Sequence, residues 1–389
     1  MYNVLTLNKI AACGTDLLDK SKYTVSDDEK NPDAILVRSA SMHEMELPGN
    51  LLAIARAGAG VNNIPIDKCT EKGVVVFNTP GANANAVKEL VIAGLLLSSR
   101  KIPAAMDWIK TLKGKGDEVG KLVEKGKSQF VGPEIMGKKL GVIGLGAIGI
   151  LVANAAAELG MDVYGADPYL SVENALKLSG KVHYVKSNKE IFEKCDYITL
   201  HVPALPDTKG MINAEAIASM KKTVRLLNFA RDTLVDEKAI IDALANGGMA
   251  CYVTDFATDG LIGLDGVVAM PHLGASTPES EDNCVRMIAR QLDAYLKTGA
   301  LTHCVNFPDA DPGRLTTARL VVLHRNVPSV VSSITALISR RGINISNMLN
   351  RSRGAYAVTV LDLDECPPAA TAAEIEALPT ICRARVLTP

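Results

Sequence analysis

Arg231 and His272 each follow an apolar run that is typical of a buried strand. Arg231 comes after TVRLLNFA and His272 after VVAMP, and the chain contains only six histidines. Because the carboxyl ends of parallel strands meet at one edge of a sheet, we expect these two side chains near each other. An arginine can hold a carboxylate while a histidine takes up a hydroxyl proton. The two residues therefore predict oxidation of a 2-hydroxy acid with transfer of hydride to a cofactor.

A second signal is the spacing G-x-G-x-x-G, formed by Gly144, Gly146 and Gly149 within residues 140–167. An apolar strand precedes the glycines, a helix follows them, and the next strand ends at Asp167. The first glycine permits a tight turn, the second lets a pyrophosphate approach the backbone, and the third lets helix and strand pack closely. Asp167 can hydrogen-bond ribose hydroxyls, and its charge repels a 2′-phosphate. The pattern predicts a site for NAD rather than NADP.

Two further arginines, Arg38 in AILVRSAS and Arg56 in LLAIARAGAG, also lie at the ends of apolar runs. Guanidinium groups suit carboxylate or phosphate, and the adjoining turn with Gly58 and Gly60 offers backbone N–H groups to an anion. Either arginine alone fits an ordinary surface residue better. Two at equivalent positions beside a glycine turn favour an anion-binding site.

The elements that must position these residues alternate in type along the chain. Apolar runs indicate strands at 4–7, 34–37, 51–55, 74–77, 140–143, 162–165, 197–202, 224–228, 251–255 and 267–270. Helical patterns lie at 84–99 and 277–296. Continuous apolar strands joined by helices predict parallel sheets covered on both faces. A break at 305–318 then precedes a βαββαβ pattern, which predicts a small ferredoxin-like domain.

Several motifs that carry a family resemblance span nearly the whole chain. They are VRSAS, RAGAGVNNIPID, NTPGANANAVKEL, GKKLGVIGLGAIG, LHVPALPDT, NFARDTLVDE and MPHLGAST. Together with the C-terminal pattern, this set resembles the D-2-hydroxyacid dehydrogenase family and, within it, the phosphoglycerate dehydrogenases with an ACT domain. The resemblance implies an α/β fold with two Rossmann-like, doubly wound parallel-sheet domains and a C-terminal βαββαβ domain. The implied parts are a substrate-binding domain (1–98 and 281–308), an NAD-binding domain (99–280), a linker (309–318) and an ACT regulatory domain (319–389).

The activity implied by this resemblance is NAD-dependent oxidation of 3-phosphoglycerate to 3-phosphohydroxypyruvate, the first step of serine synthesis, in a cytoplasmic homodimer or homotetramer. Arg231 would bind the substrate carboxylate, and His272 would be the acid/base. Substrate contacts are implied for Arg38, Arg56, Ala57, Gly58 and Asn83. Cofactor contacts are implied for Gly144, Gly146, Ala147, Ile148, Gly149, Asp167, Pro168, His201, Val202, Pro203, Thr208, Ala230, Asp255 and Gly274.

One member of the family's catalytic trio is missing from this chain. The family usually has a glutamate beyond the aspartate that matches Asp255, and this chain has Gly260 there, in TDFATDGLIG. Asp259 stands one residue earlier and has a shorter side chain. We hypothesise that Asp259 supports His272 after a shift of the loop; a bridging water molecule is the alternative.

Residues 324–345, HRNVPSVVSSITALISRRGINI, resemble the start of an ACT domain. The resemblance implies L-serine as an effector, bound by His324 and Asn326 on the first loop and by Asn344 from a neighbouring chain. The family usually has glycine where this chain has Ser329, and a side chain there hinders close backbone approach. A domain that serves only for dimerisation is the alternative.

Composition and charge limit the remaining classes of function. The net charge is −1, so nothing favours nucleic acid or a membrane surface as partner. The eight cysteines form no C-x-x-C pair or zinc-type spacing, which predicts reduced cytoplasmic thiols and no metal site. Two alternatives stay open: a hydroxypyruvate or glyoxylate reductase of the same family, and a non-catalytic NAD-sensing binding protein. The missing glutamate favours the second.

Overall fold

The computed structural model describes residues 1–389, which form two compact units. The first unit contains Met1–Ala82 and Glu281–Pro389, and the second contains Asn83–Ser280. Helix α3 (Ala84–Arg100) therefore lies in the second unit, whereas the family resemblance implies that most of it belongs to the substrate-binding domain. The C-terminal residues from 309 onward group with the first unit rather than forming a compact unit of their own.

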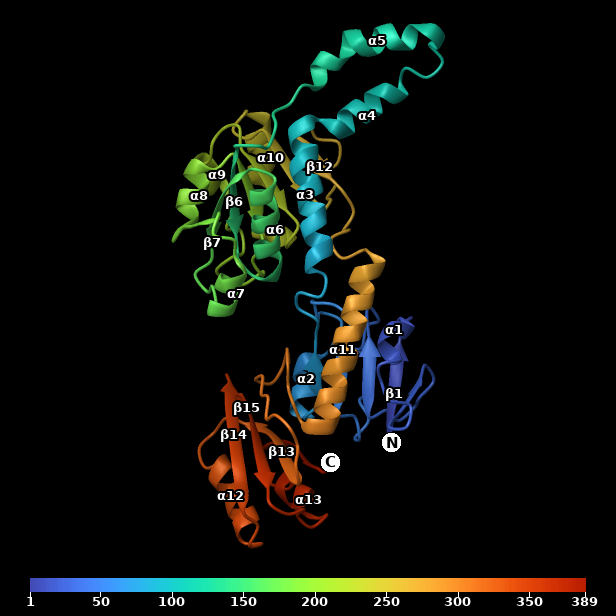
Figure 1. Cartoon of the computed structure of the whole chain (residues 1–389), viewed down its shortest axis with the longest axis vertical. Helices are drawn as coiled ribbons and strands as arrows, with labels where there is room; N and C mark the ends of the chain where they lie inside the picture. Colours follow the sequence, from blue (N-terminus) through green and yellow to red (C-terminus); the bar gives the residue numbers. More distant parts are fainter. The chain divides into compact units, whose positions relative to one another are not determined.

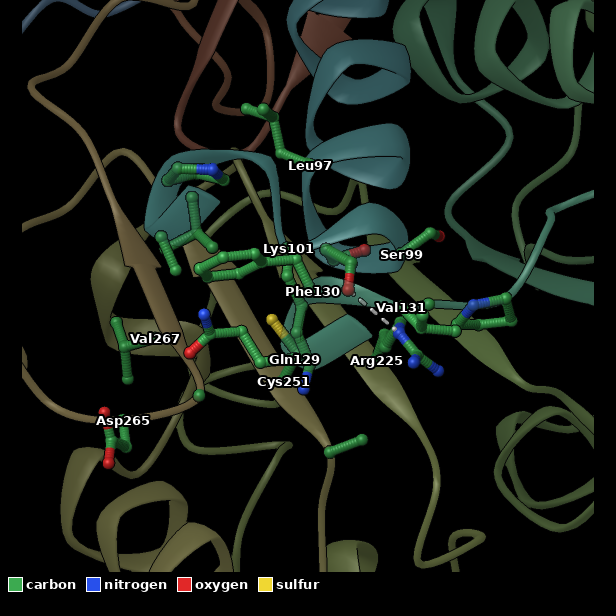
Figure 2. A pocket seen from close by; sticks show the side chains of 18 residues that line it. Leu97, Ser99, Lys101, Gln129, Phe130, Val131, Arg225, Cys251, Asp265 and Val267 are labelled. Carbon is green, nitrogen blue, oxygen red and sulfur yellow. Dashed lines mark hydrogen bonds between the residues drawn. The ribbon is translucent and has the colours of Figure 1, made fainter. Parts of the chain in front are cut away.

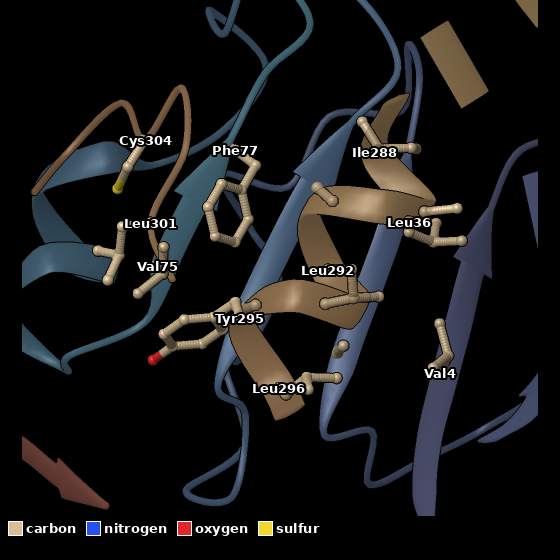
Figure 3. Close-up of a cluster of buried hydrophobic side chains, with 14 of the residues drawn as sticks. Val4, Leu36, Val75, Phe77, Ile288, Leu292, Tyr295, Leu296, Leu301 and Cys304 are labelled. Carbon is tan, nitrogen blue, oxygen red and sulfur yellow. The ribbon is translucent and has the colours of Figure 1, made fainter. Parts of the chain in front are cut away.

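A five-stranded parallel sheet in the order β2-β1-β3-β4-β5 forms the core of the first unit. Its strands are β1 (Tyr2–Leu7), β2 (Tyr23–Ser26), β3 (Ala34–Val37), β4 (Ala53–Arg56) and β5 (Val75–Phe77). Two short helices, α1 (Ala12–Thr15) and α2 (Ile66–Glu71), connect some of them. The long helix α11 (Pro278–Thr298) places Leu292 and Tyr295 in one buried cluster with Leu36 and Phe77 of the sheet (Figure 3). The sheet thereby holds Arg38 and Arg56 at the carboxyl ends of neighbouring strands.

The C-terminal part of the first unit is a four-stranded antiparallel sheet in the order β14-β15-β13-β16. Its elements are β13 (Ala318–Arg325), α12 (Val330–Ser339), β14 (Ile345–Arg353), β15 (Tyr356–Leu363), α13 (Thr371–Glu376) and β16 (Ile381–Leu387). One face packs on the two helices through Ile334 and Ile375. The other face contributes Val321 and Val358 to the same buried cluster as Phe77. The two sheets of this unit therefore share a core.

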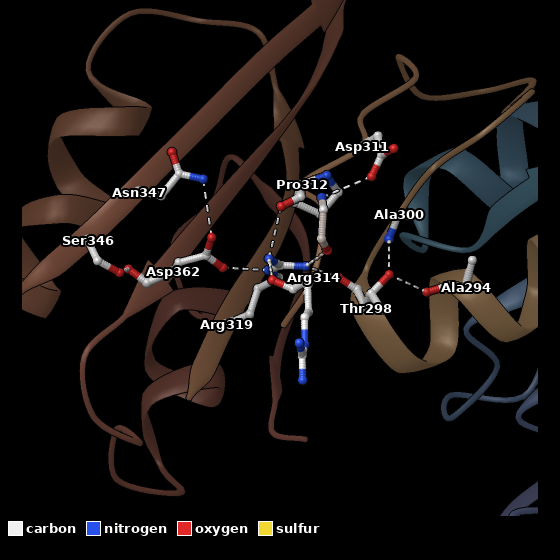
Figure 4. A network of polar contacts seen from close by, with 11 residues as sticks. Ala294, Thr298, Ala300, Asp311, Pro312, Arg314, Arg319, Ser346, Asn347 and Asp362 are labelled. Atoms are coloured by element: carbon white, nitrogen blue, oxygen red, sulfur yellow. Dashed lines mark hydrogen bonds and ion pairs between the residues drawn. The ribbon is translucent and has the colours of Figure 1, made fainter. Parts of the chain in front are cut away.

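Arg319 fixes the segment between α11 and β13, which the sequence predicts to be a linker. Its side chain is fully buried, and its Nε donates a hydrogen bond of 2.6 Å to Oδ1 of Asp362 (Figure 4). Its terminal nitrogens donate to the carbonyl oxygens of Thr298, Pro312, Gly313 and Arg314. A buried guanidinium is tolerated only when its charge and its donors are matched in this way. The Arg319 guanidinium therefore ties the backbone of residues 312–314 to Asp362 of β15.

The second unit contains a seven-stranded parallel sheet in the order β12-β11-β10-β9-β6-β7-β8. The strands are β6 (Lys139–Ile143), β7 (Asp162–Ala166), β8 (His183–Tyr184), β9 (Tyr197–Leu200), β10 (Arg225–Asn228), β11 (Cys251–Thr254) and β12 (Val267–Ala269). Helices α3 and α6 (Ala147–Glu158) cover one face. The other face packs on α8 (Asn188–Lys194), α9 (Ala214–Ala218) and α10 (Glu237–Ala245), and a short helix α7 (Val172–Lys177) follows β7. Burial of both faces explains the continuous apolar strands, and the predicted fold class is confirmed.

A pair of exposed helices leaves the body of the second unit (Figure 1). Helices α4 (Ile102–Lys110) and α5 (Val119–Gly126) contain no buried residue, and the 3₁₀ turns η1 (Gly116–Glu118) and η2 (Lys127–Phe130) flank α5. Trp108 packs against Phe130 with ring centroids 5.3 Å apart. The two helices are therefore solvated rather than part of the core of this unit. None of the helices in the chain combines the length and the apolar composition that a membrane span needs.

Candidate active site

The glycine turn after β6 has the backbone that its sequence predicts. Gly144 has a φ of 94°, and a Cβ atom there would lie 2.5 Å from the carbonyl oxygen of His201. A Cβ atom on Gly149 would overlap the carbonyl oxygen of Gly144. A Cβ atom on Gly146, at the start of α6, would meet no heavy atom within 4 Å. The first and third glycines are therefore required by the fold, while the second leaves open space beside the backbone, which suits an approaching pyrophosphate.

Asp167 is held beside this turn by two backbone hydrogen bonds. Its Oδ2 accepts from the N–H of Leu145 and its Oδ1 from the N–H of Tyr169, both at 2.8 Å. Carboxylate oxygens have further lone pairs, so the side chain can still accept bonds from ribose hydroxyls. The side chain is only partly buried, and Pro168 next to it is exposed. The residues present therefore fit the adenosine part of NAD.

The loop after β9 completes this side of the sheet. Nε2 of His201 lies 3.0 Å from the hydroxyl of Thr199, and burial lowers the pKa of His201 to about 3, so its ring is neutral at physiological pH. The hydroxyl of Thr208 donates to the carbonyl of Pro203 at 2.6 Å and accepts from the N–H of Leu205 at 2.8 Å. Thr208 therefore fixes the shape of the loop that begins with Val202.

Asp255 follows β11, between the strands that precede the two candidate catalytic residues. Its side chain is 2% exposed, and Oδ2 accepts from the N–H of Gly274 at 3.2 Å, whereas the buried Oδ1 has no hydrogen-bond partner. Burial raises the pKa of this carboxyl, while the Gly274 N–H and the charge of His272 lower it. An unpaired buried acceptor costs free energy unless a donor reaches it. The carboxamide of a nicotinamide offers such a donor.

Arg231 and His272 follow β10 and β12, which flank β11, so the structure places both at the same edge of the sheet as Asp255. Asn228 shapes the loop at Arg231, because its Oδ1 accepts from the N–H of Ala230 and its Nδ2 donates to the Arg231 carbonyl at 2.9 Å. The exposed Arg231 side chain donates to the carbonyl of Ala230 at 2.6 Å. Most of its guanidinium donors therefore remain available for a ligand.

The His272 ring is exposed and packs edge-on against Phe256, with ring centroids 5.0 Å apart. The structure records no hydrogen bond or ion pair between this ring and the exposed Asp259. A Cβ atom on Gly260 would lie 2.7 Å from Oε1 of Glu237, in the first turn of α10. Glu237 therefore brings a carboxylate to the position where the family glutamate would begin. The position of Glu237 in the sequence does not indicate this, because only folding brings α10 next to this loop.

In the first unit, the two predicted anion-binding arginines are neighbours. Nε of Arg56 donates to the carbonyl of Arg38 at 3.1 Å, and Arg38 forms an ion pair of 2.6 Å with Glu281. A Cβ atom on Gly58 would overlap the Arg56 guanidinium, so this glycine allows the arginine to lie against the turn. Ala57 is buried beside it. Asn83, also predicted to bind substrate, precedes α3 in the second unit and makes no capping bond there.

The residues predicted for an effector site have different surroundings. His324 is 2% exposed within β13, not on the following loop, because the pairing of β13 with β15 continues as far as Arg325. Its ring nitrogens lie 2.8 Å from the Arg325 carbonyl and from the hydroxyl of Thr359, and burial lowers its pKa. Asn326 donates to the Gly354 carbonyl at 3.1 Å. Asn344 donates to Asp364 at 2.6 Å.

A cavity of about 590 Å³ lies at the opposite edge of the second sheet (Figure 2). It is lined by Arg225, Cys251 and Val267, the first residues of β10, β11 and β12, and by parts of α3 and η2. Ligands of open α/β sheets bind beyond the carboxyl ends of the strands. This cavity is therefore separate from the candidate active site.

Comparisons with known proteins agree with the geometry. Residues 92–274 match the NAD binding domain of the D-isomer specific 2-hydroxyacid dehydrogenases. The D-3-phosphoglycerate dehydrogenase of Haemophilus influenzae is 30% identical over 98% of this chain and 94% of its own length. The chain belongs to the D-2-hydroxyacid dehydrogenase family.

Other members of this family differ in length from the chain. The D-3-phosphoglycerate dehydrogenase of Methanocaldococcus jannaschii is 36% identical over 74% of the chain, which spans 54% of that protein. The NAD⁺-bound 3-phosphoglycerate dehydrogenase of Entamoeba histolytica, a solved structure, has a TM-score of 0.61 and 27% identity, covering 78% of this chain and 98% of its own. The chain therefore carries the NAD-binding domain of the D-2-hydroxyacid dehydrogenases.

Proposed function

We propose that this chain catalyses the NAD-dependent oxidation of 3-phospho-D-glycerate to 3-phosphohydroxypyruvate, the first step of L-serine biosynthesis. The observation that carries the choice of substrate is the pair Arg38 and Arg56 at neighbouring strand ends. A phosphorylated hydroxy acid has a second anionic group besides its carboxylate, and guanidinium groups suit phosphate. The similarity to the Haemophilus influenzae enzyme over nearly the whole chain supports the same substrate.

NAD, held by the turn Gly144–Gly149, Asp167 and Asp255, supplies the acceptor for the substrate hydride. The α6 N-terminus would offer free backbone N–H groups to the pyrophosphate. The buried Oδ1 of Asp255, which has no hydrogen-bond partner in the chain, would accept a hydrogen bond from the carboxamide of the cofactor. The remaining predicted contacts with the cofactor are Ala147, Ile148, Pro168, His201, Val202, Pro203, Thr208, Ala230 and Gly274.

The protein's own side chains then orient the substrate and move its proton. Arg231 binds the substrate carboxylate with its guanidinium donors, which also polarises the neighbouring oxygen. The imidazole of His272 accepts the proton of the C2 hydroxyl as the C2–H bond breaks, and returns a proton in the reverse reaction. Asp259 stabilises the protonated imidazole after its loop moves. Arg38 and Arg56 hold the phosphate, together with Ala57, Gly58 and Asn83.

The remaining assignments concern the parts of the chain and its setting. By function, residues 1–98 and 281–308 are assigned to substrate binding, 99–280 to NAD binding and 319–389 to an ACT domain, although the first compact unit ends at Ala82 and α3 lies in the second. L-Serine is the candidate effector, with His324, Asn326 and Asn344 as its contacts. The protein acts as a homodimer or homotetramer in the cytoplasm, where eight free cysteines are chemically compatible with a reducing milieu.

The test is oxidation of NADH by the purified chain with 3-phosphohydroxypyruvate, with hydroxypyruvate as the parallel substrate. Loss of NADH absorbance with the phosphorylated substrate alone is the expected result. Faster turnover of hydroxypyruvate or glyoxylate would make the chain a reductase for unphosphorylated acids. Binding of NADH without turnover of any 2-keto acid would make it a binding protein.

A further inference from the structure

Arg38 has an acidic partner within its own unit. Nη2 of Arg38 lies 2.6 Å from Oε1 of Glu281, and the side chains are 42% and 43% exposed. Glu281 belongs to α11, which packs on the same sheet that carries Arg38. A ligand anion that reaches Arg38 therefore meets a carboxylate at the same guanidinium.

Arg56 and Cys284 lie near the Arg38–Glu281 ion pair. Arg56 donates to the Arg38 backbone, so its side chain is anchored beside the pair. The thiol of Cys284, one turn along α11 from Glu281, is buried, which raises its pKa; Arg38 and Arg56 lower the pKa and Glu281 raises it. Arg38, Arg56 and Glu281 thus all act electrostatically on this thiol. Their sum is one positive charge, where the two arginines alone would give two.

We propose that Glu281 is a built-in counter-ion that competes with the substrate phosphate for Arg38 and thereby sets the affinity of the site for phosphorylated acids. This inference rests on the function proposed above. The pair is exposed, so the carboxylate is readily displaced from the guanidinium. Once displaced, however, it remains beside a phosphate of like charge and weakens its binding. A substrate without the phosphate does not meet this repulsion.

The decisive variant is Glu281→Gln, which keeps the shape of the side chain and removes its charge. We expect the KM for 3-phosphohydroxypyruvate to fall by about three- to tenfold with kcat nearly unchanged, because only binding of the anion is altered. The KM for hydroxypyruvate should stay the same. Glu279→Gln is the matched control, since Glu279 is an exposed acid of the same helix for which no ion pair is recorded.

An unchanged or higher KM for the phosphorylated substrate in Glu281→Gln would overturn the proposal and leave Glu281 as a residue that only positions Arg38. If the wild-type chain turns over neither substrate, the proposed function fails, and binding of 3-phosphoglycerate by calorimetry decides the counter-ion role separately. Tighter binding by Glu281→Gln than by the wild type supports the counter-ion role. Equal or weaker binding by the variant, or no detectable binding by either protein, rejects it.

Discussion

The glycine turn and the catalytic residues lie at the same edge of one sheet, but the structure fixes them to different degrees. At the turn, both oxygens of Asp167 accept backbone hydrogen bonds, and Gly149 packs against Gly144 without room for a side chain. On the catalytic side, the Arg231 side chain donates to the carbonyl of the preceding residue, Ala230. The ring of His272 packs against the ring of Phe256. Backbone hydrogen bonds and close backbone packing therefore fix the cofactor site. The side chains of Arg231 and His272 are not held by hydrogen bonds to other side chains.

The largest effect should come from His272→Asn. If His272 carries the proton, kcat should fall by about 10²- to 10⁴-fold, the usual contribution of a general acid or base. Because the ring makes no hydrogen bond that supports the turn, NADH affinity measured by fluorescence titration should remain close to that of the wild type. Retention of most of the turnover would show that His272 is only a residue at the end of a strand.

Gly149→Ala should disrupt the glycine turn that forms the cofactor site. The added Cβ would overlap the Gly144 carbonyl, a backbone atom that cannot move away cheaply, so the turn must distort. We expect NADH affinity to fall about tenfold or more and thermal stability to decrease, as for overpacked core positions. Gly146→Ala is the matched control, since its Cβ meets nothing in the protein. It should weaken NADH binding with the melting temperature unchanged; unaltered NADH binding in both variants would place the cofactor elsewhere.

The sequence predicts the turn better than the catalytic loop for a physical reason. The three glycines and Asp167 act through local backbone geometry, which their spacing encodes directly. The surroundings of Gly260 depend on Glu237, which only the packing of α10 brings near. In the same way, the break at 305–318 looks like a free linker in the sequence, but the buried Arg319 comes from the strand that follows and binds its carbonyl groups. Contacts between distant segments leave no periodic signal.

A smaller effect is expected from Asp259→Ala, which tests the support of His272 on the catalytic side. If Asp259 supports the protonated imidazole, kcat should fall by about tenfold and the pH–rate profile should shift, as expected when a charged partner is removed. Gly260→Glu is the complementary variant and should raise kcat, because it restores the glutamate that the family usually has at this position. The new side chain is tolerated, since it need displace only the flexible end of Glu237. Turnover and pH–rate profile both unaltered in Asp259→Ala would exclude Asp259 from the mechanism.

The smallest expected effect concerns the C-terminal part, where the backbone is strained rather than preorganised. Ser329 precedes α12 with a φ of 68°, a left-handed conformation, and its side chain makes no capping bond. A non-glycine residue pays about 1–2 kcal/mol for this conformation, while glycine adds flexibility to the unfolded chain. Ser329→Gly should therefore stabilise the protein by about 0.5–1 kcal/mol in denaturant unfolding.

Ser332→Gly provides the control for this effect, because Ser332 lies in the first turn of α12 and donates to the Ser329 carbonyl at 2.9 Å. Glycine in a helix costs up to about 1 kcal/mol, so this variant should be destabilised. Opposite signs for two serine-to-glycine changes so close together would show that backbone conformation, rather than loss of a hydroxyl, decides the outcome. If Ser329→Gly were destabilised as well, the left-handed backbone at residue 329 would not be a source of strain.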